Sequence, residues 1–190
     1  MKIIWRTAMS MDGKLASVGH HLDFLQSIHD RQAAASDFPA FLDSIDAILL
    51  GADTLRWLVR EGHGWPHGDK PTWLVSHDDD LRTRIGDTPA PLRRVQGDLR
   101  PVLTAMEEGG ARRVWLCGGG QLAAQLLAID RIDEIEVTIA PVALGAGPSL
   151  FGDRSLTCQP FSVLDCRTVA GNAVAIRWGR THKQPIADRT

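Results

Sequence analysis

The chain has 190 residues, 44% of them hydrophobic and 23% charged, which suits one globular domain with a full core. Its formal charge of −2 argues against nucleic acid or an anionic membrane as the main partner, since both recruit basic surfaces. Three cysteines without C-x-x-C spacing argue against a disulfide or zinc scaffold and predict reduced thiols in a cytoplasmic protein. The N-terminus is charged too early for a signal peptide, and no later run is apolar enough to span a membrane.

The first segments alternate between strand and helix patterns. Residues 2–9 contain an apolar run typical of a strand buried on both faces, and the turn signal Asp12-Gly13 follows it. Residues 14–27 show no clear period and predict a loop over one edge of the sheet. A helical pattern over 28–44 restarts at Asp37, which we expect to cap a second piece with a proline in its first turn.

A second strand-to-helix pattern covers residues 46–59. The apolar run ends at Gly51, and the next turn contains Asp53 and Thr54, either of which can cap a helix without any ligand. The pattern then predicts a third strand over 72–76, a short strand near 93–96 and a helix over 100–108.

A loop rich in glycine and histidine covers residues 60–70. His63 and His67 stand four positions apart, as paired metal ligands on a helix do. The glycines and the proline around them exclude that helix, and no third ligand stands nearby. We therefore expect no metal site.

The chain is organised around residues 111–128. An apolar run of strand length, residues 114–117, meets three glycines, and leucines then recur at helical spacing. Glycines leave no Cβ to keep a ligand from the backbone, and the N–H groups at a helix start attract anions. The turn predicts a site for a cofactor phosphate, with a tight turn that binds nothing as the alternative. It matches neither G-x-G-x-x-G nor G-x-x-x-x-G-K-[ST], so neither a standard Rossmann domain nor a P-loop is indicated.

The last segments are strand-like. Residues 131–140 alternate apolar and polar side chains, which predicts a strand with one face toward solvent. Two further strands, residues 156–167 and 173–179, flank the hairpin signal Gly171-Asn172. Together these patterns predict one α/β domain with a largely parallel sheet and an antiparallel edge.

Several short motifs then stand out together. They are Ser10-Met11-Asp12-Gly13-Lys14, Gly51-x-x-Thr54, Gly118-Gly119-Gly120-Gln121-Leu122, Asp133-Glu134-Ile135 and Pro141-Val142-x-Leu144-Gly145-x-Gly147-Pro148-x-Leu150-Phe151-Gly152. In these motifs the chain resembles the dihydrofolate-reductase-like superfamily, and most closely the reductase domain of bacterial riboflavin biosynthesis proteins and their stand-alone relatives. The resemblance implies a mixed sheet of about eight strands flanked by helices. It implies one domain over 1–180 that ends in a hairpin, with a polar tail over 181–190.

The resemblance also implies an NADPH-dependent reductase that acts on a small-molecule substrate as a homodimer. The residues that would bind this cofactor are Thr7 and Ala8 beside the nicotinamide, Gly51 and Thr54 on one side of the dinucleotide, Ser76 near the adenosine 2′-phosphate, and Gly118, Gly119, Gly120, Gln121 and Leu122 around the phosphates.

The same resemblance implies that Asp12 and Lys14 lie at the mouth of the substrate pocket, and they are the catalytic candidates. Asp12 would donate a proton or position water, and Asp37 is the second choice for that role. The residues alone favour a turn-forming role for Asp12 over a catalytic one.

Three departures from the resemblance leave the substrate open. Cys117 stands where the riboflavin-pathway reductases often carry an acidic residue that touches substrate. The arginine with which those enzymes grip a ribose phosphate has only Arg56 or Arg60 as a counterpart. His77 follows the third strand without an adjacent arginine, which weakens the expected preference for NADPH over NADH.

The leading hypothesis is therefore NADPH-dependent reduction of 5-amino-6-(5-phosphoribosylamino)uracil or a related heterocycle. The alternatives are a dihydrofolate or dihydropterin reductase, and a nucleotide-binding protein without turnover. The zinc-deaminase motifs H-x-E and P-C-x-x-C do not occur in the sequence, so any deamination is done elsewhere.

Overall fold

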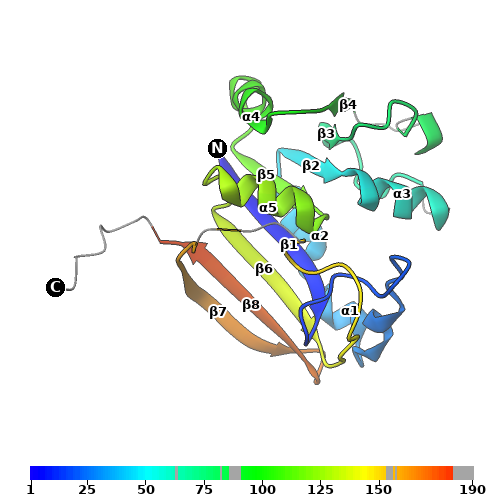
Figure 1. Ribbon diagram of the computed structural model, residues 1–190. Helices are drawn as coiled ribbons and strands as arrows, with labels where there is room; N and C mark the ends of the chain where they lie inside the picture. Colours follow the sequence, from blue (N-terminus) through cyan, green and yellow to red (C-terminus); the bar gives the residue numbers. More distant parts are fainter. Residues whose placement is uncertain (63, 82, 86–90, 153–155, 157, 182–190) are drawn as a thin grey trace.

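The computed structural model describes residues 1–62, 64–81, 83–85, 91–152, 156 and 158–181. Across these residues, eight strands form one sheet in the order β4-β3-β2-β5-β1-β6-β8-β7 (Figure 1). From β4 to β6 the neighbours run parallel, whereas β8 is antiparallel to both β6 and β7. The predicted α/β domain with an antiparallel C-terminal hairpin is confirmed. Of the predicted tail, all but Thr181 lies outside the described residues.

The strands are β1 (Lys2–Ser10), β2 (Ala47–Gly51), β3 (Thr72–Val75), β4 (Leu92–Val95), β5 (Arg113–Cys117), β6 (Glu134–Ala140), β7 (Phe161–Val169) and β8 (Ala173–Arg180). The α-helices are α1 (Arg31–Ala34), α2 (Phe38–Asp43), α3 (Ala52–Arg60), α4 (Leu99–Glu108) and α5 (Gly120–Ala128), and the 3-10 helices are η1 (Asp23–Ser27) and η2 (Thr83–Ile85). None of the helices described is long and apolar enough to cross a membrane.

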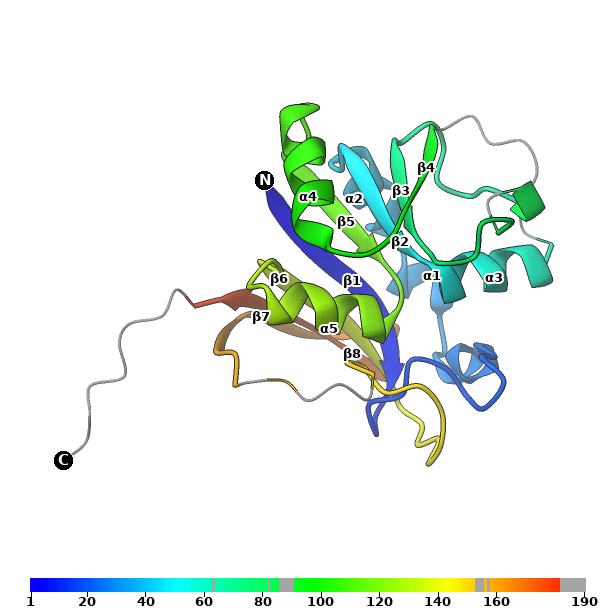
Figure 2. The same ribbon diagram turned by 45° about the horizontal axis from the view of Figure 1, so that its top comes forward.

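The helices cover the two faces of the sheet separately. On one face α4 and α5 pack over a core that includes Ile3, Trp5 and Leu103, and Figure 2 shows both helices in front of the sheet. On the other face α2 and α3 pack over a core that includes Ile4 and Leu55. Successive residues of a strand point to opposite faces, so the unbroken apolar run of β1 supplies both cores.

The helical pattern predicted over 28–44 is confirmed only in part. α1 is a single turn, capped by the carboxylate of Asp30 on the N–H of Ala33 (2.9 Å). α2 begins after Asp37 with Pro39 in its first turn, as predicted. Because proline has no N–H and restricts the residue before it, the two pieces stay separate. The carboxylate of the N-cap makes ion pairs instead of a capping hydrogen bond.

Two strand boundaries also differ from the prediction. β7 begins at Phe161, because Pro160 cannot donate to a ladder and Leu156 packs against the core outside any strand. β6 begins at Glu134, because the carboxylate of Asp133 accepts a backbone N–H of β1 (2.7 Å) at the strand entrance.

The winding of the sheet reverses between β2 and β5. These parallel neighbours pair from Ala47↔Val114 to Leu50↔Cys117. α3 follows β2 on one face of the sheet, whereas α5 follows β5 on the other. In open α/β sheets, ligands bind outside the carboxyl ends of the strands at such a switch point.

Candidate functional site

Two helices begin next to each other at the carboxyl ends of β2 and β5. α3 starts after Gly51 and α5 after Gly119, and neither N-cap glycine has a side chain to cap the first turn. A Cβ on Gly51 would lie 3.6 Å from the carbonyl oxygen of Gly118 and 3.8 Å from Cα of Gly119. The two junctions therefore meet through their backbones, where the positive ends of two helix dipoles favour an anionic ligand.

The three consecutive glycines have different physical reasons to be glycine. Gly118 has φ +81°, and a Cβ on it would collide with the hydroxyl of Thr54. A Cβ on Gly120 would come within 2.6 Å of the carbonyl oxygen of Ser149. Gly119 has φ +80°, but a Cβ there would meet no atom closer than 3.7 Å. Of the three, only Gly119 lacks a protein neighbour that excludes a side chain, so its positive φ, and no steric conflict, accounts for a glycine there.

Gln121 and Leu122 differ in what they can offer a phosphate. Leu122 is 4% exposed and its side chain packs into the core, so only its backbone can face a ligand. Gln121 is exposed, and its Cγ lies 3.1 Å from where a Cβ of Gly152 would stand.

Thr7 and Ala8 lie on β1 beyond its pairing with β5. That pairing stops at Trp5↔Leu116, whereas β1 continues beside β6 as far as Ser10. The two residues predicted to face the nicotinamide are thus at the carboxyl edge of the sheet, one strand away from the glycine turn.

Ser76 directly follows β3 and is 3% exposed. Its hydroxyl accepts a hydrogen bond from the N–H of Asp78 (3.0 Å). Arg94 of β4 donates to the carbonyl oxygen of Ser76 (3.1 Å) and pairs with the carboxylate of Asp79 (2.5 Å). The sequence prediction missed this arginine, because Arg94 comes from the neighbouring strand and not from a position beside Ser76 along the chain. The adjacent arginines in the predicted strand near 93–96 were the available signal.

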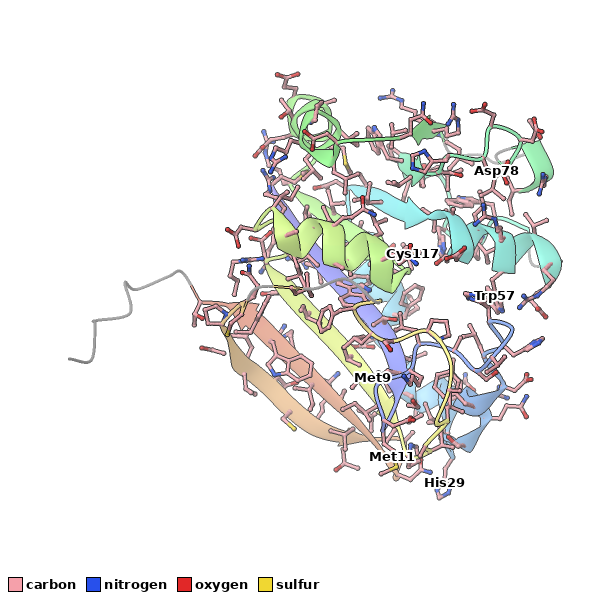
Figure 3. The ribbon with its side chains drawn as sticks, viewed as in Figure 1. Met9, Met11, His29, Trp57, Asp78 and Cys117 are labelled. Atoms are coloured by element: carbon pink, nitrogen blue, oxygen red, sulfur yellow. The ribbon has the colours of Figure 1, made fainter. Side chains whose placement is uncertain are left out.

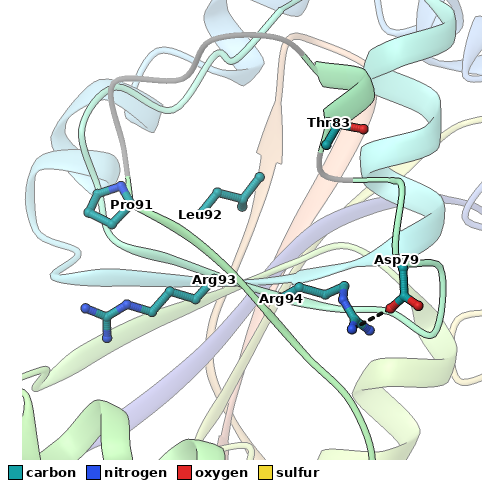
Figure 4. A pocket seen from close by; sticks show the side chains of 6 residues that line it. All are labelled: Asp79, Thr83, Pro91, Leu92, Arg93 and Arg94. Carbon is teal, nitrogen blue, oxygen red and sulfur yellow. Dashed lines mark ion pairs between the residues drawn. The ribbon is translucent and has the colours of Figure 1, made fainter.

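A pocket of about 450 Å³ opens beside this arginine (Figure 4). Figure 4 shows Arg93 and Arg94 extending to opposite sides of β4, with Asp79 paired to Arg94. Thr83 and Pro91 line the pocket at opposite ends. A phosphate group bound here would compete with Asp79 for the same guanidinium.

Asp12 joins two loops. Its carboxylate accepts hydrogen bonds from the hydroxyl of Ser10 (2.5 Å), the N–H of Leu144 (3.0 Å) and the N–H of Gly145 (2.7 Å). The Ser10 hydroxyl and these backbone N–H groups lower the pKa of Asp12 to about 2. At neutral pH the group is a carboxylate without a proton to donate, and its contacts support the turn-forming interpretation.

Lys14 lies where the loop after β1 meets the loop after β6. It forms an isolated antiparallel bridge with Ser149, and its Nζ donates to the Ser149 hydroxyl (3.2 Å). The N–H of Leu150 donates to the carbonyl oxygen of Gly13 (2.9 Å). Gly120 packs under the same loop, which brings Lys14 close to the glycine turn.

Asp37 is held in ion pairs. One carboxylate oxygen pairs with Arg6 of β1, and the other lies 3.5 Å from Arg167 of β7. These partners line a charged groove of about 410 Å³ together with Glu136 and Arg177. Both carboxylate oxygens of Asp37 are therefore already engaged by guanidinium groups.

The acid expected from the resemblance is replaced by a buried thiol. The Sγ of Cys117 lies 3.7 Å from Nε2 of His67, and the imidazole lies between the rings of Trp65 and Trp115, with centroid distances of 5.1 and 4.9 Å. Burial lowers the pKa of His67 to about 4 and raises the pKa of the Cys117 thiol, so both groups are neutral at pH 7. Figure 3 shows Cys117 beside the first turn of α5.

From the sequence, His67 was a candidate only as a metal ligand, and its contact with the thiol was not predicted. His63, the other candidate ligand, lies outside the described residues. Within those residues, no three His, Cys, Asp or Glu side chains are placed to hold a metal ion.

The two arginines that could replace the missing phosphate-binding residue are both engaged. Arg56 pairs with an acid one turn earlier on α3 (2.8 Å) and with Asp78 (3.6 Å). Arg60 donates to the carbonyl oxygens of Gly19 (3.1 Å) and His20 (2.9 Å), which ties the loop after β1 to α3.

The chain is similar to known proteins over nearly its whole length. The chain is 24% identical to the protein YwjB of Bacillus subtilis (strain 168), described as uncharacterized, over 94% of this chain and 98% of that protein. It superposes on a putative riboflavin biosynthesis protein from Shewanella sp. PV-4 with a TM-score of 0.85 and 25% identity, covering 96% of this chain and 100% of that one.

A second solved structure is a diaminohydroxyphosphoribosylaminopyrimidine deaminase/5-amino-6-(5-phosphoribosylamino)uracil reductase from Thermotoga maritima. Its TM-score is 0.71 at 14% identity, over 95% of this chain and 56% of that one, which shows a shared fold. The profile of the family described as "RibD C-terminal domain" matches residues 1–170, a span that includes both glycine junctions and every strand from β1 to β7. The chain therefore belongs to the RibD C-terminal domain family.

Proposed function

We propose that this protein is a reductase of the riboflavin-pathway kind, which uses NADPH, or NADH, to reduce a small heterocyclic or ribosylamine substrate. One observation carries the proposal: the uncapped starts of α3 and α5 meet through Gly51, Gly118 and Gly119 at the switch point of the sheet. A dinucleotide has the phosphates that such a place binds. Membership of the RibD C-terminal domain family favours reduction over other uses of a dinucleotide.

The residues present fit a dinucleotide. The backbone of α5's first turn would bind the phosphates, and the lack of a side chain at Gly119 would let them approach that backbone. Thr54 would border the other side, and Thr7 and Ala8 would lie by the nicotinamide. When bound, the reduced nicotinamide supplies hydride. The chain's own task is then to hold cofactor and acceptor in contact and to exclude water.

The choice between NADPH and NADH would depend on Arg94. Its position beside Ser76 suits a 2′-phosphate, which usually recruits an arginine. Asp79 already neutralises this guanidinium, so a 2′-phosphate would have to displace a carboxylate. We therefore propose NADPH as the cofactor with NADH as a competent substitute.

We propose different roles for the two predicted catalytic residues. Asp12 would position a loop, and Lys14 would contact the acceptor. Asp12 fixes the loop around Leu144 in its ionised form. Lys14 presents an ammonium group near the glycine turn, bonded to a serine hydroxyl that a substrate can replace. Such a group can orient the acceptor or supply a proton to it.

The chain contains six tryptophans, so titration of the protein with NADPH and with NADH, followed by tryptophan fluorescence, tests the proposal. Binding should quench tryptophan fluorescence, and flat titrations with both nucleotides would reject every reductase hypothesis. If NADPH binds, loss of its absorbance with 5-amino-6-(5-phosphoribosylamino)uracil supports the riboflavin-pathway reaction, whereas loss with dihydrofolate alone supports a dihydrofolate reductase. Binding without turnover of either compound would favour a nucleotide-binding protein.

A further inference from the structure

His67 is a buried polar side chain with an unfilled hydrogen bond. It is 8% exposed, and its Nδ1 has no hydrogen-bond partner among the described residues. Its other ring nitrogen faces the thiol of Cys117. Buried polar atoms in native proteins are nearly always paired, so an unpaired ring nitrogen indicates a partner from outside these residues.

The thiol determines which kind of partner is needed. If Cys117 donates to Nε2, only the Nδ1–H of His67 is left unpaired. If Nε2–H donates to sulfur instead, both the thiol hydrogen and the Nδ1 lone pair are left unpaired. The first arrangement leaves fewer buried groups unsatisfied and makes Nδ1 a donor. The missing partner is then a hydrogen-bond acceptor, such as a carbonyl oxygen.

The surroundings of the imidazole suit an uncharged planar partner. The rings of Trp65 and Trp115 flank it edge-on, and both the thiol and the imidazole are neutral at pH 7. The indole N–H of Trp65 bonds back to Gly68 within the same loop (3.0 Å), and Gly68 has φ +63° with open space around it. The loop that holds the imidazole therefore borders open space at Gly68.

The two arginines that could bind a substrate phosphate do not favour a phosphate partner. Arg56 is paired with two carboxylates, and Arg60 is bonded to two backbone carbonyls. The Thermotoga relative is named for a phosphoribosyl substrate. In this chain both arginines already have partners for the fork of N–H groups that would bind such a phosphate.

We propose that His67, oriented by Cys117, binds the acceptor of the reaction through a hydrogen bond from Nδ1 to a ring carbonyl of an uncharged heterocycle. The assignment rests on the proposed function. Cys117 ends β5 one residue before the glycine turn that would hold the cofactor, so the imidazole lies next to that site. His67 thus recognises the heterocyclic ring of the acceptor, and the acceptor needs no sugar phosphate in order to bind.

The first test measures binding of 5,6-diaminouracil to the full chain saturated with NADP⁺, which prevents turnover. His67→Phe should weaken this binding at least about tenfold, the loss expected for one buried hydrogen bond. Binding of NADP⁺ should stay within about twofold of the unmodified protein, since the phosphates lie elsewhere. The control His29→Phe, at an exposed histidine, should change neither affinity. Ribose 5-phosphate should not compete with 5,6-diaminouracil.

The outcomes separate the two proposals. Failure of the unmodified protein to bind NADP⁺ would reject the proposed function itself. With NADP⁺ bound, the acceptor assignment is overturned if 5,6-diaminouracil does not bind, if His67→Phe leaves its affinity unchanged, or if ribose 5-phosphate competes.

A second measurement begins with the unmodified protein, so it does not depend on whether His67→Phe folds. Nitrogen-15 spectra of the histidine rings should show His67 as the Nδ1–H tautomer, and its Nδ1 resonance should shift when 5,6-diaminouracil is added. Cys117→Ala should mix the two tautomers, because the thiol no longer holds Nε2. A His67 spectrum that shows the Nε2–H tautomer, or that does not respond to saturating 5,6-diaminouracil, would overturn the assignment.

Discussion

The hydroxyl of Thr54 stands where a Cβ of Gly118 would have to be. Thr54 belongs to the first turn of α3, and Gly118 follows β5, so this contact joins the two helix starts at the switch point. Thr54 was predicted as a boundary of the cofactor site, and its packing adds a structural reason for the residue. The contact sets how closely the two N-termini approach.

Gly118→Ala should destabilise the fold by roughly 2–5 kcal/mol, from left-handed backbone strain plus collision with Thr54. In the double variant with Thr54→Ala the collision with the hydroxyl disappears, whereas the strain, about 1–2 kcal/mol, and a close contact of 3.0 Å with the Cβ at position 54 remain. Urea unfolding of the two single variants and the double variant forms a cycle that isolates the contact. Equal effects of Gly118→Ala with and without Thr54 would show that the two residues do not touch.

Gly119→Ala should weaken NADPH binding by about tenfold or more, because its Cβ would enter the space proposed for the phosphates. Gly110→Ala is the matched control. Gly110 has φ +92°, and a Cβ on it would meet no atom within 4 Å, so its backbone strain is similar, but it lies before β5 at the opposite edge of the sheet. Fluorescence titration measures both affinities. Similar affinity in both variants would place the phosphates elsewhere.

Much of this site follows from local sequence. The apolar run before Cys117, the three glycines and the leucines of α5 predict a strand, a turn and a helix, and all three are present. Buried strands and glycine turns are readable because each depends on a few adjacent residues. The same holds for Gly51 after β2 and for the hairpin of β7 and β8.

The contacts that the sequence did not reveal join distant segments. Arg94 reaches Ser76 only because β4 pairs with β3, and His67 reaches Cys117 only because a loop folds across the sheet. No periodicity encodes either contact. The helical pattern over 28–44 was right about the restart at Asp37 and wrong about its extent, because α1 begins only after the cap at Asp30 and ends after a single turn.

Arg94→Gln should lower the ratio of NADPH to NADH affinity by about tenfold, because one charged hydrogen bond to the 2′-phosphate is lost. Asp79→Asn should raise the same ratio, since it removes the carboxylate that competes for the guanidinium. Arg93→Gln is a control of equal charge change on the other side of β4, where the guanidinium lies over Trp73 (5.3 Å). Parallel titrations with the two nucleotides measure the ratio, and an unaltered ratio in Arg94→Gln would remove Arg94 from the cofactor site.

The loop contact of Asp12 should make stability depend on acid. The pKa of Asp12 is lowered to about 2 in the folded chain, against about 3.9 in the unfolded chain. The carboxylate therefore stabilises the fold fully at pH values above the unfolded-state pKa. As pH falls, the unfolded chain takes up the proton first, and the stabilisation is lost between about pH 4 and about pH 2.

At neutral pH, Asp12→Asn should therefore unfold at a lower urea concentration than the unmodified chain. This difference in urea midpoint should become smaller as the pH falls through that window. Ser10→Ala removes the largest contribution to the pKa shift, so the folded-state pKa rises and the loss should be complete at a higher pH. A difference that stays constant from neutral pH to about pH 2 would mean that the Asp12 carboxylate is not what holds the loop.

We expect Arg60 to stabilise the loop after β1 by hydrogen bonds and not to bind a substrate phosphate. Arg60→Met removes three hydrogen bonds, two to the carbonyl oxygens of Gly19 and His20 and one to the carboxylate of Glu61, while keeping a side chain of similar length. Amide hydrogen exchange over residues 17–21 should speed up by about tenfold, since this segment then opens more easily. Arg56→Met is the control, because it alters the same helix without touching that loop. Unchanged exchange in Arg60→Met, combined with weaker binding of a phosphorylated substrate, would instead assign this arginine to the substrate.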